Sequence, residues 1–154
     1  MQAVIPAETP MHFDQARRLF EEYAASLNFD LEFQNFREEI ADIRGAYGAP
    51  RGGVLLACRD GRTAGCVALR DLGGTICEMK RLYVKPGFRG LRLGRLLAQA
   101  VIHRAREMGY TAMRLDTIVS MESAIRLYRS LGFRPIDPYR INPVPGAAFF
   151  ELIL

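Results

Sequence analysis

The first third of the chain has the hydrophobic pattern of a short strand followed by two helices. Residues 4–6 indicate an edge strand. Apolar residues then recur every three or four positions over residues 14–27, which predicts an amphipathic helix with Asp14 as its N-cap. A second helical pattern runs through residues 33–43 and ends by the glycines at 45 or 48. Two helices are therefore expected before any long strand.

In the middle of the chain the period changes to that of strands. Residues 54–58 and 64–69 are apolar runs on either side of an Asp60-Gly61 turn, which predicts a hairpin. After Gly73-Gly74, a third run extends over residues 75–84. The sequence thus predicts three antiparallel strands in succession.

The last third alternates between the two periods. Helical spacing returns over residues 93–108, and a strand is expected over residues 111–117. A strand, a helix and another strand form a crossover unit, which favours parallel pairing of the two strands. A short helix over 124–131, a strand over 133–136 and a final strand over 147–154 complete the pattern.

Composition limits the classes of protein that fit. The chain has 154 residues, 49% of them hydrophobic, which suffices for the core of one domain and excludes a disordered or collagen-like chain. No stretch reaches the roughly 18 apolar residues of a membrane span, and no signal-peptide pattern starts the chain. We therefore expect a cytoplasmic protein with no membrane partner. The three cysteines lack the paired spacing of a zinc site and are expected to be reduced core residues: Cys58, Cys66 and Cys77.

Charge is distributed unevenly along the chain. The net charge is +4, but the first 44 residues hold nine acidic and four basic side chains, so this part carries −5 and the remainder +9. Such an asymmetry suggests that the two parts face different partners.

The segment richest in candidate chemistry is the junction between the third long strand and the next helix, residues 81–95. A strand that leads through a glycine-containing turn into a helix presents free backbone N–H groups and the positive end of the helix dipole to one point, as anion sites do. Gly90 and Gly94 allow a phosphate to approach the backbone closely. The spacing fits neither a Walker loop nor a dinucleotide fingerprint, so another phosphate-bearing ligand is indicated. The alternative is a glycine turn with a solvated basic face, which would account for Arg89, Arg92 and Arg95.

Two motifs in this chain resemble those of a known family. Residues 89–94 match the Gln/Arg-x-x-Gly-x-Gly/Ala pyrophosphate loop of the GNAT superfamily of N-acetyltransferases, and residues 82–86 match its Leu-Tyr-Val-x-Pro lead-in. Residues 124–133 resemble a second motif, Asn-x-x-Ala-x-x-Leu/Phe-Tyr-x-x-x-Gly-Phe, with Met121 where asparagine is common. One departure is that Arg92 occupies the position of the first glycine of the loop pattern. The order of the predicted elements is also similar to that superfamily over nearly the whole chain.

The resemblance implies both a fold and a co-substrate. The fold is α+β with three layers (α/β/α), a mixed, mostly antiparallel, twisted sheet with a central splay, and about four helices, in a single domain over residues 1–154. The co-substrate is acetyl-CoA, and no metal is implied. By resemblance, the pantetheine pairs with backbone groups of Leu82, Tyr83 and Val84. Arg126 is a further candidate for binding the phosphates, and its alternative is a solvated side chain. The implied pyrophosphate cradle consists of Arg89, Gly90, Leu91, Arg92, Leu93 and Gly94.

Two residues are candidates for catalysis. The resemblance places the hydroxyl of Tyr128 near the thioester sulfur, where it can protonate the departing thiolate; the alternative is a core tyrosine with its hydroxyl satisfied locally. An ammonium group, with a pKa of about 10, must lose a proton before it attacks a carbonyl, so a base is needed. Glu78 is the candidate base, close to where the family often carries a basic glutamate. Its alternative role is a structural pair with Lys80 or Arg81.

The expected function is transfer of an acetyl group from acetyl-CoA to a primary amine by direct attack in a ternary complex, without a covalent enzyme intermediate. A CoA-binding or sensing domain without turnover is one alternative. The other is a nucleic-acid-binding protein with an arginine-rich phosphate clamp, which explains neither the Tyr128 motif nor the acidic first part of the chain. No nucleic-acid partner is therefore expected.

The acceptor is expected to be a small-molecule or peptide amine, and a homodimer is left open. Asp30 and Glu32 lie in the break between the first two predicted helices, where the family commonly builds one wall of the acceptor site. Carboxylates there would attract a cationic amine, which makes these two residues candidates for substrate binding. The alternative is a set of solvated acidic faces on the two helices, including Glu38 and Glu39.

Overall fold

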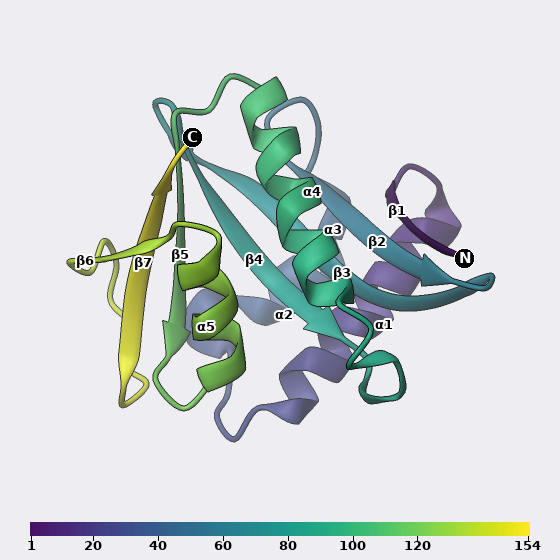
Figure 1. Cartoon of the computed structure of the whole chain (residues 1–154), viewed down its shortest axis with the longest axis horizontal. Helices are drawn as coiled ribbons and strands as arrows, with labels where there is room; N and C mark the ends of the chain where they lie inside the picture. Colours follow the sequence, from purple (N-terminus) through teal and green to yellow (C-terminus); the bar gives the residue numbers. More distant parts are fainter.

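A seven-stranded sheet in the order β1-β2-β3-β4-β5-β7-β6 runs through the computed structural model, which describes residues 1–154 (Figure 1). All neighbouring strands are antiparallel except β4 and β5, which are parallel. This confirms the crossover expected around the central helix. The strands are β1 Gln2–Pro6, β2 Gly53–Arg59, β3 Arg62–Gly73, β4 Ile76–Val84, β5 Ala112–Ile118, β6 Arg134–Ile136 and β7 Ala147–Ile153.

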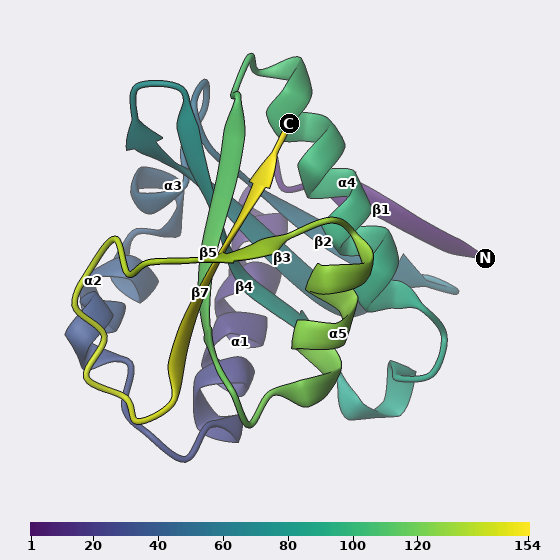
Figure 2. The ribbon, with the colours of Figure 1, turned by 60° about the vertical axis from the view of Figure 1, so that its left-hand side comes forward.

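Helices cover both faces of the sheet, so the molecule has the three layers expected from the sequence (Figure 2). Helices α1 to α3 pack on one face, and α4 and α5 pack on the other. There are five α-helices, where about four were expected. They are α1 Pro10–Ser26, α2 Phe36–Ala41, α3 Ile43–Ala46, α4 Leu93–Glu107 and α5 Glu122–Ser130, with 3-10 turns η1 Glu32–Gln34 and η2 Pro86–Phe88.

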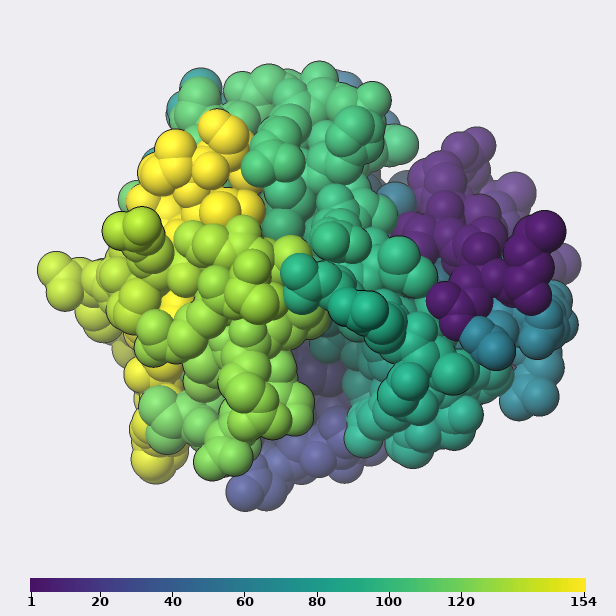
Figure 3. Space-filling view, viewed as in Figure 1, coloured from purple at the N-terminus to yellow at the C-terminus, as the bar shows by residue number.

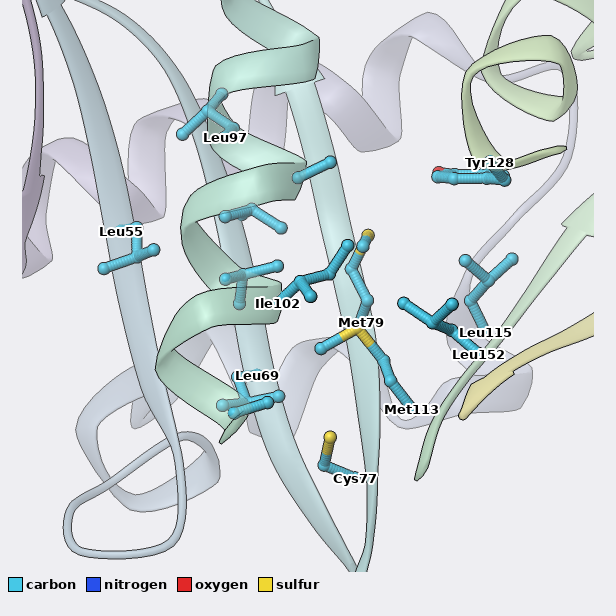
Figure 4. Packing of buried hydrophobic residues seen from close by; sticks show 14 of the residues in the cluster. Leu55, Leu69, Cys77, Met79, Leu97, Ile102, Met113, Leu115, Tyr128 and Leu152 are labelled. Atoms are coloured by element: carbon cyan, nitrogen blue, oxygen red, sulfur yellow. The ribbon is translucent and has the colours of Figure 1, made fainter. Parts of the chain in front are cut away.

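The core is divided by the sheet into two clusters, because successive side chains of a strand point to opposite faces. On β2, Val54 and Leu56 face α1 and α3, whereas Leu55 and Ala57 belong to the cluster under α4 and α5. Figure 4 shows the second cluster, in which α4 side chains such as Leu97 pack over the sheet. Both faces of the inner strands are therefore apolar, which is why residues 54–58 and 64–69 stand in the sequence as continuous apolar runs.

The start of the first helix was predicted wrongly. The helix begins at Pro10, and Thr9 is its N-cap, with its hydroxyl accepting a hydrogen bond from the His12 N–H at 3.1 Å. Proline is favoured at the first helical position because it has no N–H to leave unpaired. Asp14 therefore lies inside the helix, where it forms an exposed ion pair with Arg17 at 2.7 Å.

The second predicted helix is broken into η1, α2 and α3. Asn35 adopts a left-handed conformation (φ 57°), which ends η1 and separates it from α2. Asp42 ends α2 and caps α3 by accepting a hydrogen bond from the Gly45 N–H at 2.9 Å. Asparagine and aspartate favour such breaks because their side chains compete for backbone groups.

The sheet splays at its centre, as expected. β4 and β5 pair only where Ile76–Glu78 faces Ala112–Arg114, and the strands diverge beyond this point (Figure 1). The register between β3 and β4 also shifts, because three steps on β4, from Lys80 to Tyr83, face two on β3. Arg81 lies in this bulge with a φ of 60°. The splay leaves the edge of β4 from Met79 onward without a strand partner on the β5 side.

Candidate active site

A cavity lies between the diverging ends of β4 and β5. Its walls come from Met79–Leu82 of β4, Leu115–Ile118 of β5, Tyr128 and neighbouring residues of α5, and the segment between α1 and α2. Figure 3 shows the surface hollowed between the residues of α5 and those that precede α4. The cavity volume is about 90 Å³, room for only a few water molecules, so it can take the reacting groups of a ligand but not a whole nucleotide.

The loop that leads into α4 presents free backbone donors. None of the six N–H groups from Gly90 to Arg95 donates a hydrogen bond to another group of the protein. Gly90 has a φ of 83° and open space beside it, and a Cβ at Gly94 would lie 3.9 Å from Leu127 and Val84. The first turn of α4 thus sits between the end of β4 and α5, and its free N–H groups and positive dipole end form the kind of site that binds anions.

Arg92, which stands where the motif has its first glycine, adopts a backbone conformation that favours glycine. Its φ of 62° and ψ of 20° are left-handed. This conformation costs an L-residue about 1–2 kcal/mol, which glycine would avoid. An arginine at this position therefore carries a conformational cost that a glycine would not.

Tyr128 lies in the wall of the cavity. The residue is only 8% exposed, and its ring packs edge-on against Phe133 with 5.7 Å between the ring centroids. Its hydroxyl makes no hydrogen bond within the protein, and in Figure 4 it points away from α5 toward β4. Burial raises the pKa of this hydroxyl, so it keeps its proton at neutral pH. The arrangement leaves a proton donor facing the cavity, and the local hydrogen bond expected of a core tyrosine is absent.

Glu78 is fully buried at the centre of an ion cluster and does not line the cavity. Its Oε1 accepts a hydrogen bond from Arg70 Nε at 2.8 Å, and its Oε2 accepts hydrogen bonds from the Tyr139 hydroxyl at 2.6 Å and from Arg140 Nη2. Lys80 Nζ lies 3.9 Å from Oε1. Burial alone would raise the pKa of Glu78, but the neighbouring cations outweigh it and lower the pKa. Its predicted role as a base is not tested by this geometry.

Arg81, named above as an alternative partner of Glu78, binds Glu39 instead. Its Nε and Nη2 donate to the two carboxylate oxygens of Glu39 at 2.8 and 2.7 Å, and its Nη1 donates to Gln34 Oε1 at 2.9 Å. Both members of this pair are buried. Glu39 is therefore not part of a solvated helix face, because α2 turns it toward the bulge of β4.

Lys80 lines the cavity, although the sequence indicated it only as a partner for Glu78. Its side chain is 4% exposed, and Nζ donates a hydrogen bond to Gln34 Oε1 at 2.9 Å. Burial, helped by the charge of Arg81, lowers the pKa of Lys80 to about 7. A lysine in the middle of a strand whose residues 76–79 and 82–84 are mostly apolar is the sequence signal that could have identified it.

The other residues predicted to contact the co-substrate do not all lie at the cavity. Leu82 lines the cavity, but the side chain of Tyr83 packs on the opposite face of the sheet, against α1. Arg89 is exposed and donates to the Val84 carbonyl at 3.1 Å. Arg126 is exposed on α5, 3.3 Å from the Ser123 hydroxyl, and does not line the cavity.

The two predicted acceptor carboxylates lie on the outside of the segment between α1 and α2. Both are exposed; Asp30 accepts a hydrogen bond from the Glu32 N–H at 2.9 Å, and Glu32 accepts one from the Arg37 N–H at 3.0 Å. The residues that alternate with them, including Leu31 and Phe33, line the cavity. A role of the two carboxylates in substrate binding therefore stays a prediction.

Comparison with known proteins gives consistent results. A family model described as the acetyltransferase (GNAT) family matches residues 13–133. An uncharacterized N-acetyltransferase of Schizosaccharomyces pombe is 40% identical over 153 residues, which cover 97% of this chain and 93% of the relative.

Solved structures with the same fold include two bacterial ones. An acetyltransferase from Streptococcus agalactiae aligns with a TM-score of 0.80 at 24% identity and covers 99% of this chain and 98% of its own. A putative acetyltransferase from Salmonella typhimurium, determined with its cofactor acetyl-CoA, aligns with a TM-score of 0.72 at 19% identity. The alignment covers 99% of this chain and 93% of the Salmonella chain.

None of the helices in this structure combines the length and the apolar character that a membrane span requires.

Proposed function

This chain belongs to the GNAT family of acetyltransferases, and from that premise we propose that it transfers the acetyl group of acetyl-CoA to a primary amine by direct attack in a ternary complex. One observation carries the proposal: the opening between β4 and β5 has a free tyrosine hydroxyl in its wall and six free N–H groups at the helix start beside it. The first suits a departing thiolate, and the second suits a pyrophosphate.

The residues around the opening fit the co-substrate, which supplies an acetyl group activated as a thioester. The N–H groups of Gly90–Arg95 and the positive end of α4 would hold the pyrophosphate. The unpaired edge of β4 at Leu82–Val84 would hydrogen-bond the amides of the pantetheine, in the manner of an added strand. Nothing within 4 Å of a Cβ at Gly90 obstructs this approach.

Tyr128 is the proposed general acid. Its hydroxyl is protonated, unpaired and at the wall of the cavity, and donation of its proton would stabilise the thiolate as it departs. General acid–base assistance of this kind contributes typically about 10²–10⁴-fold to a rate.

Glu78 is the proposed base, with one structural condition. Glu78 is fully buried and does not line the cavity, so it could receive a proton from the amine only through a water chain or after Tyr139 and Arg140, which bind Oε2, have moved. A Glu78→Gln variant separates this role from a positioning role. Loss of the ascending limb of the pH–rate profile supports a base, whereas an intact profile with a raised acceptor KM supports positioning.

The proposal is tested by following free CoA release from acetyl-CoA against a panel of primary amines. Release that depends on the amine supports transfer. Stabilisation of the protein by acetyl-CoA with no amine-dependent release would support the alternative, a CoA-binding domain without turnover. Release that does not depend on any amine would indicate hydrolysis and overturn the proposal.

A further inference from the structure

Lys80 is the one basic side chain at the cavity wall that lacks a carboxylate of its own, and a ligand carboxylate beside it would favour its protonated form. The charge of Arg81 is matched by the two oxygens of Glu39. The single charge of Glu78 is shared by Arg70 and Arg140, both of which hydrogen-bond to it, while Lys80 lies 3.9 Å away. Around Glu78 there are thus three basic groups for one carboxylate, and the excess lies at the cavity.

The donors on this wall are only partly used. An ammonium group has three N–H donors, and Lys80 uses one of them, to Gln34 Oε1 at 2.9 Å. That same oxygen accepts from Arg81, which fixes the orientation of the amide. Gln34 lines the cavity, and its NH2 group makes no hydrogen bond within the protein. A ligand group rich in hydrogen-bond acceptors is the natural complement of these unused donors.

The opposite wall has the reverse polarity. Asp116 of β5 lines the cavity, and only its Oδ2 is bound, by Asn142 Nδ2 at 3.1 Å. The other oxygen is available to an ammonium group, on the side of the cavity formed by β5 and α5, where Tyr128 also lies. The cavity therefore has donors on its β4 wall and an acceptor on its β5 wall.

We propose that the acceptor carries a carboxylate close to its amine, as an amino acid does, and that Lys80 and Gln34 bind this carboxylate on the β4 wall. This inference rests on the proposed function and gives the class of its acceptor. The amine of such a molecule points toward Asp116 and Tyr128, and its side chain extends out of the cavity along the apolar residues of the segment between α1 and α2, among them Phe29, Leu31 and Phe33. This acceptor carries a negative charge next to its amine, whereas Asp30 and Glu32 led us to expect an acceptor with a positive charge alone.

The test compares acceptors that differ only in the carboxylate: leucine with 3-methylbutylamine, and phenylalanine with 2-phenylethylamine. We expect kcat/KM to be at least 10-fold higher for the amino acid of the preferred pair. Lys80→Met should remove most of this preference by raising the KM for the amino acid. Lys85→Met, which changes the only other lysine and lies outside the cavity, should retain it. Equal use of both members of every pair by the unchanged protein, which needs no variant, overturns the proposal.

A binding measurement separates this inference from the proposed function. The corresponding N-acetylated products are added with CoA, and the shift in melting temperature is measured for the unchanged protein and for Lys80→Met. A larger shift with N-acetylleucine than with N-acetyl-3-methylbutylamine, lost in the variant, supports the carboxylate site even if no transfer occurs. Transfer to amines with equal shifts for the two products leaves the proposed function standing and overturns this inference.

Discussion

Replacement of Lys80 by methionine should change how the stability of the protein depends on pH. Methionine has a similar length, is apolar and fits the buried position, but it cannot be protonated. Lys80 faces Glu78 and Arg81 on its own strand, Arg70 on β3, Arg140 from the connection between β6 and β7, and Gln34 of η1. The side chain of Lys80 is only 4% exposed and lies among these other cations, so its protonated form is destabilised in the folded protein.

The magnitude follows from the pKa. Burial lowers the pKa of Lys80 from 10.5 to about 7 in the folded state. Below pH 7 the lysine is protonated in both states, so the folded protein bears the full cost of a buried charge. Between about pH 7 and 10.5 only the unfolded chain keeps the proton, so the free energy of unfolding rises by about 1.4 kcal/mol per pH unit. Between pH 6 and pH 9 this amounts to about 3 kcal/mol.

The assay is equilibrium unfolding in urea at pH 6, 7, 8 and 9. The free energy of unfolding of Lys80→Met minus that of the unchanged protein should be largest at pH 6 and fall by about 2–3 kcal/mol by pH 9. Lys85→Met serves as the control for removal of a lysine, and its difference from the unchanged protein should lack this decline. A Lys80→Met difference that is constant with pH would refute the reasoning, because Lys80 would then keep its proton in both states.

Three further predictions follow from other contacts. Gly94→Asp should abolish the rise in melting temperature caused by acetyl-CoA, because a carboxylate would face the phosphates, whereas Gly94→Ala should retain it, since a Cβ there has 3.9 Å of clearance. Tyr128→Phe should lower kcat at least tenfold, measured where chemistry limits the rate, while the melting temperature changes little, because the hydroxyl has no hydrogen bond to lose. Glu39→Gln should lower the free energy of unfolding by about 3 kcal/mol in a urea titration, because it leaves Arg81 buried without its counter-charge.

Each of these three has an outcome that would contradict it. Equal acetyl-CoA stabilisation of both Gly94 variants would move the pyrophosphate away from the start of α4. An unchanged kcat in Tyr128→Phe would return that residue to a packing role. A loss of less than about 1 kcal/mol in Glu39→Gln would mean that Arg81 finds solvent or another partner.

The regular part of the fold could be predicted because its signals are local. The continuous apolar runs at residues 54–58 and 64–69 follow from strands whose two faces each meet a core cluster, and the glycine turns bound these runs. The parallel pair followed from the strand–helix–strand order. The start of α1 was missed although Thr9-Pro10 is itself a helix-start signal, because a periodic apolar pattern begins only after Asp14.

The candidate site could be predicted only in part. The loop at residues 89–94 and Tyr128 lie in contiguous motifs, so the sequence sufficed to single them out. The surroundings of Glu78 depend on Tyr139 and Arg140, which are 61 and 62 residues away in the sequence and reach it through an irregular connection. No local pattern indicates such contacts. The polarity of the cavity, and with it the role of Lys80, therefore emerged only from the structure.

The most direct test of the central claim is to locate the transferred acetyl group. The protein is incubated with acetyl-CoA labelled with 13C at the acetyl carbonyl and with an 15N-labelled amino acid that gives CoA release, and the product is examined by NMR. We predict a carbonyl carbon coupled directly to the amine nitrogen, formed at a rate that falls at least tenfold in Tyr128→Phe. Label recovered only as free acetate, or only on the protein, would contradict direct transfer to the amine.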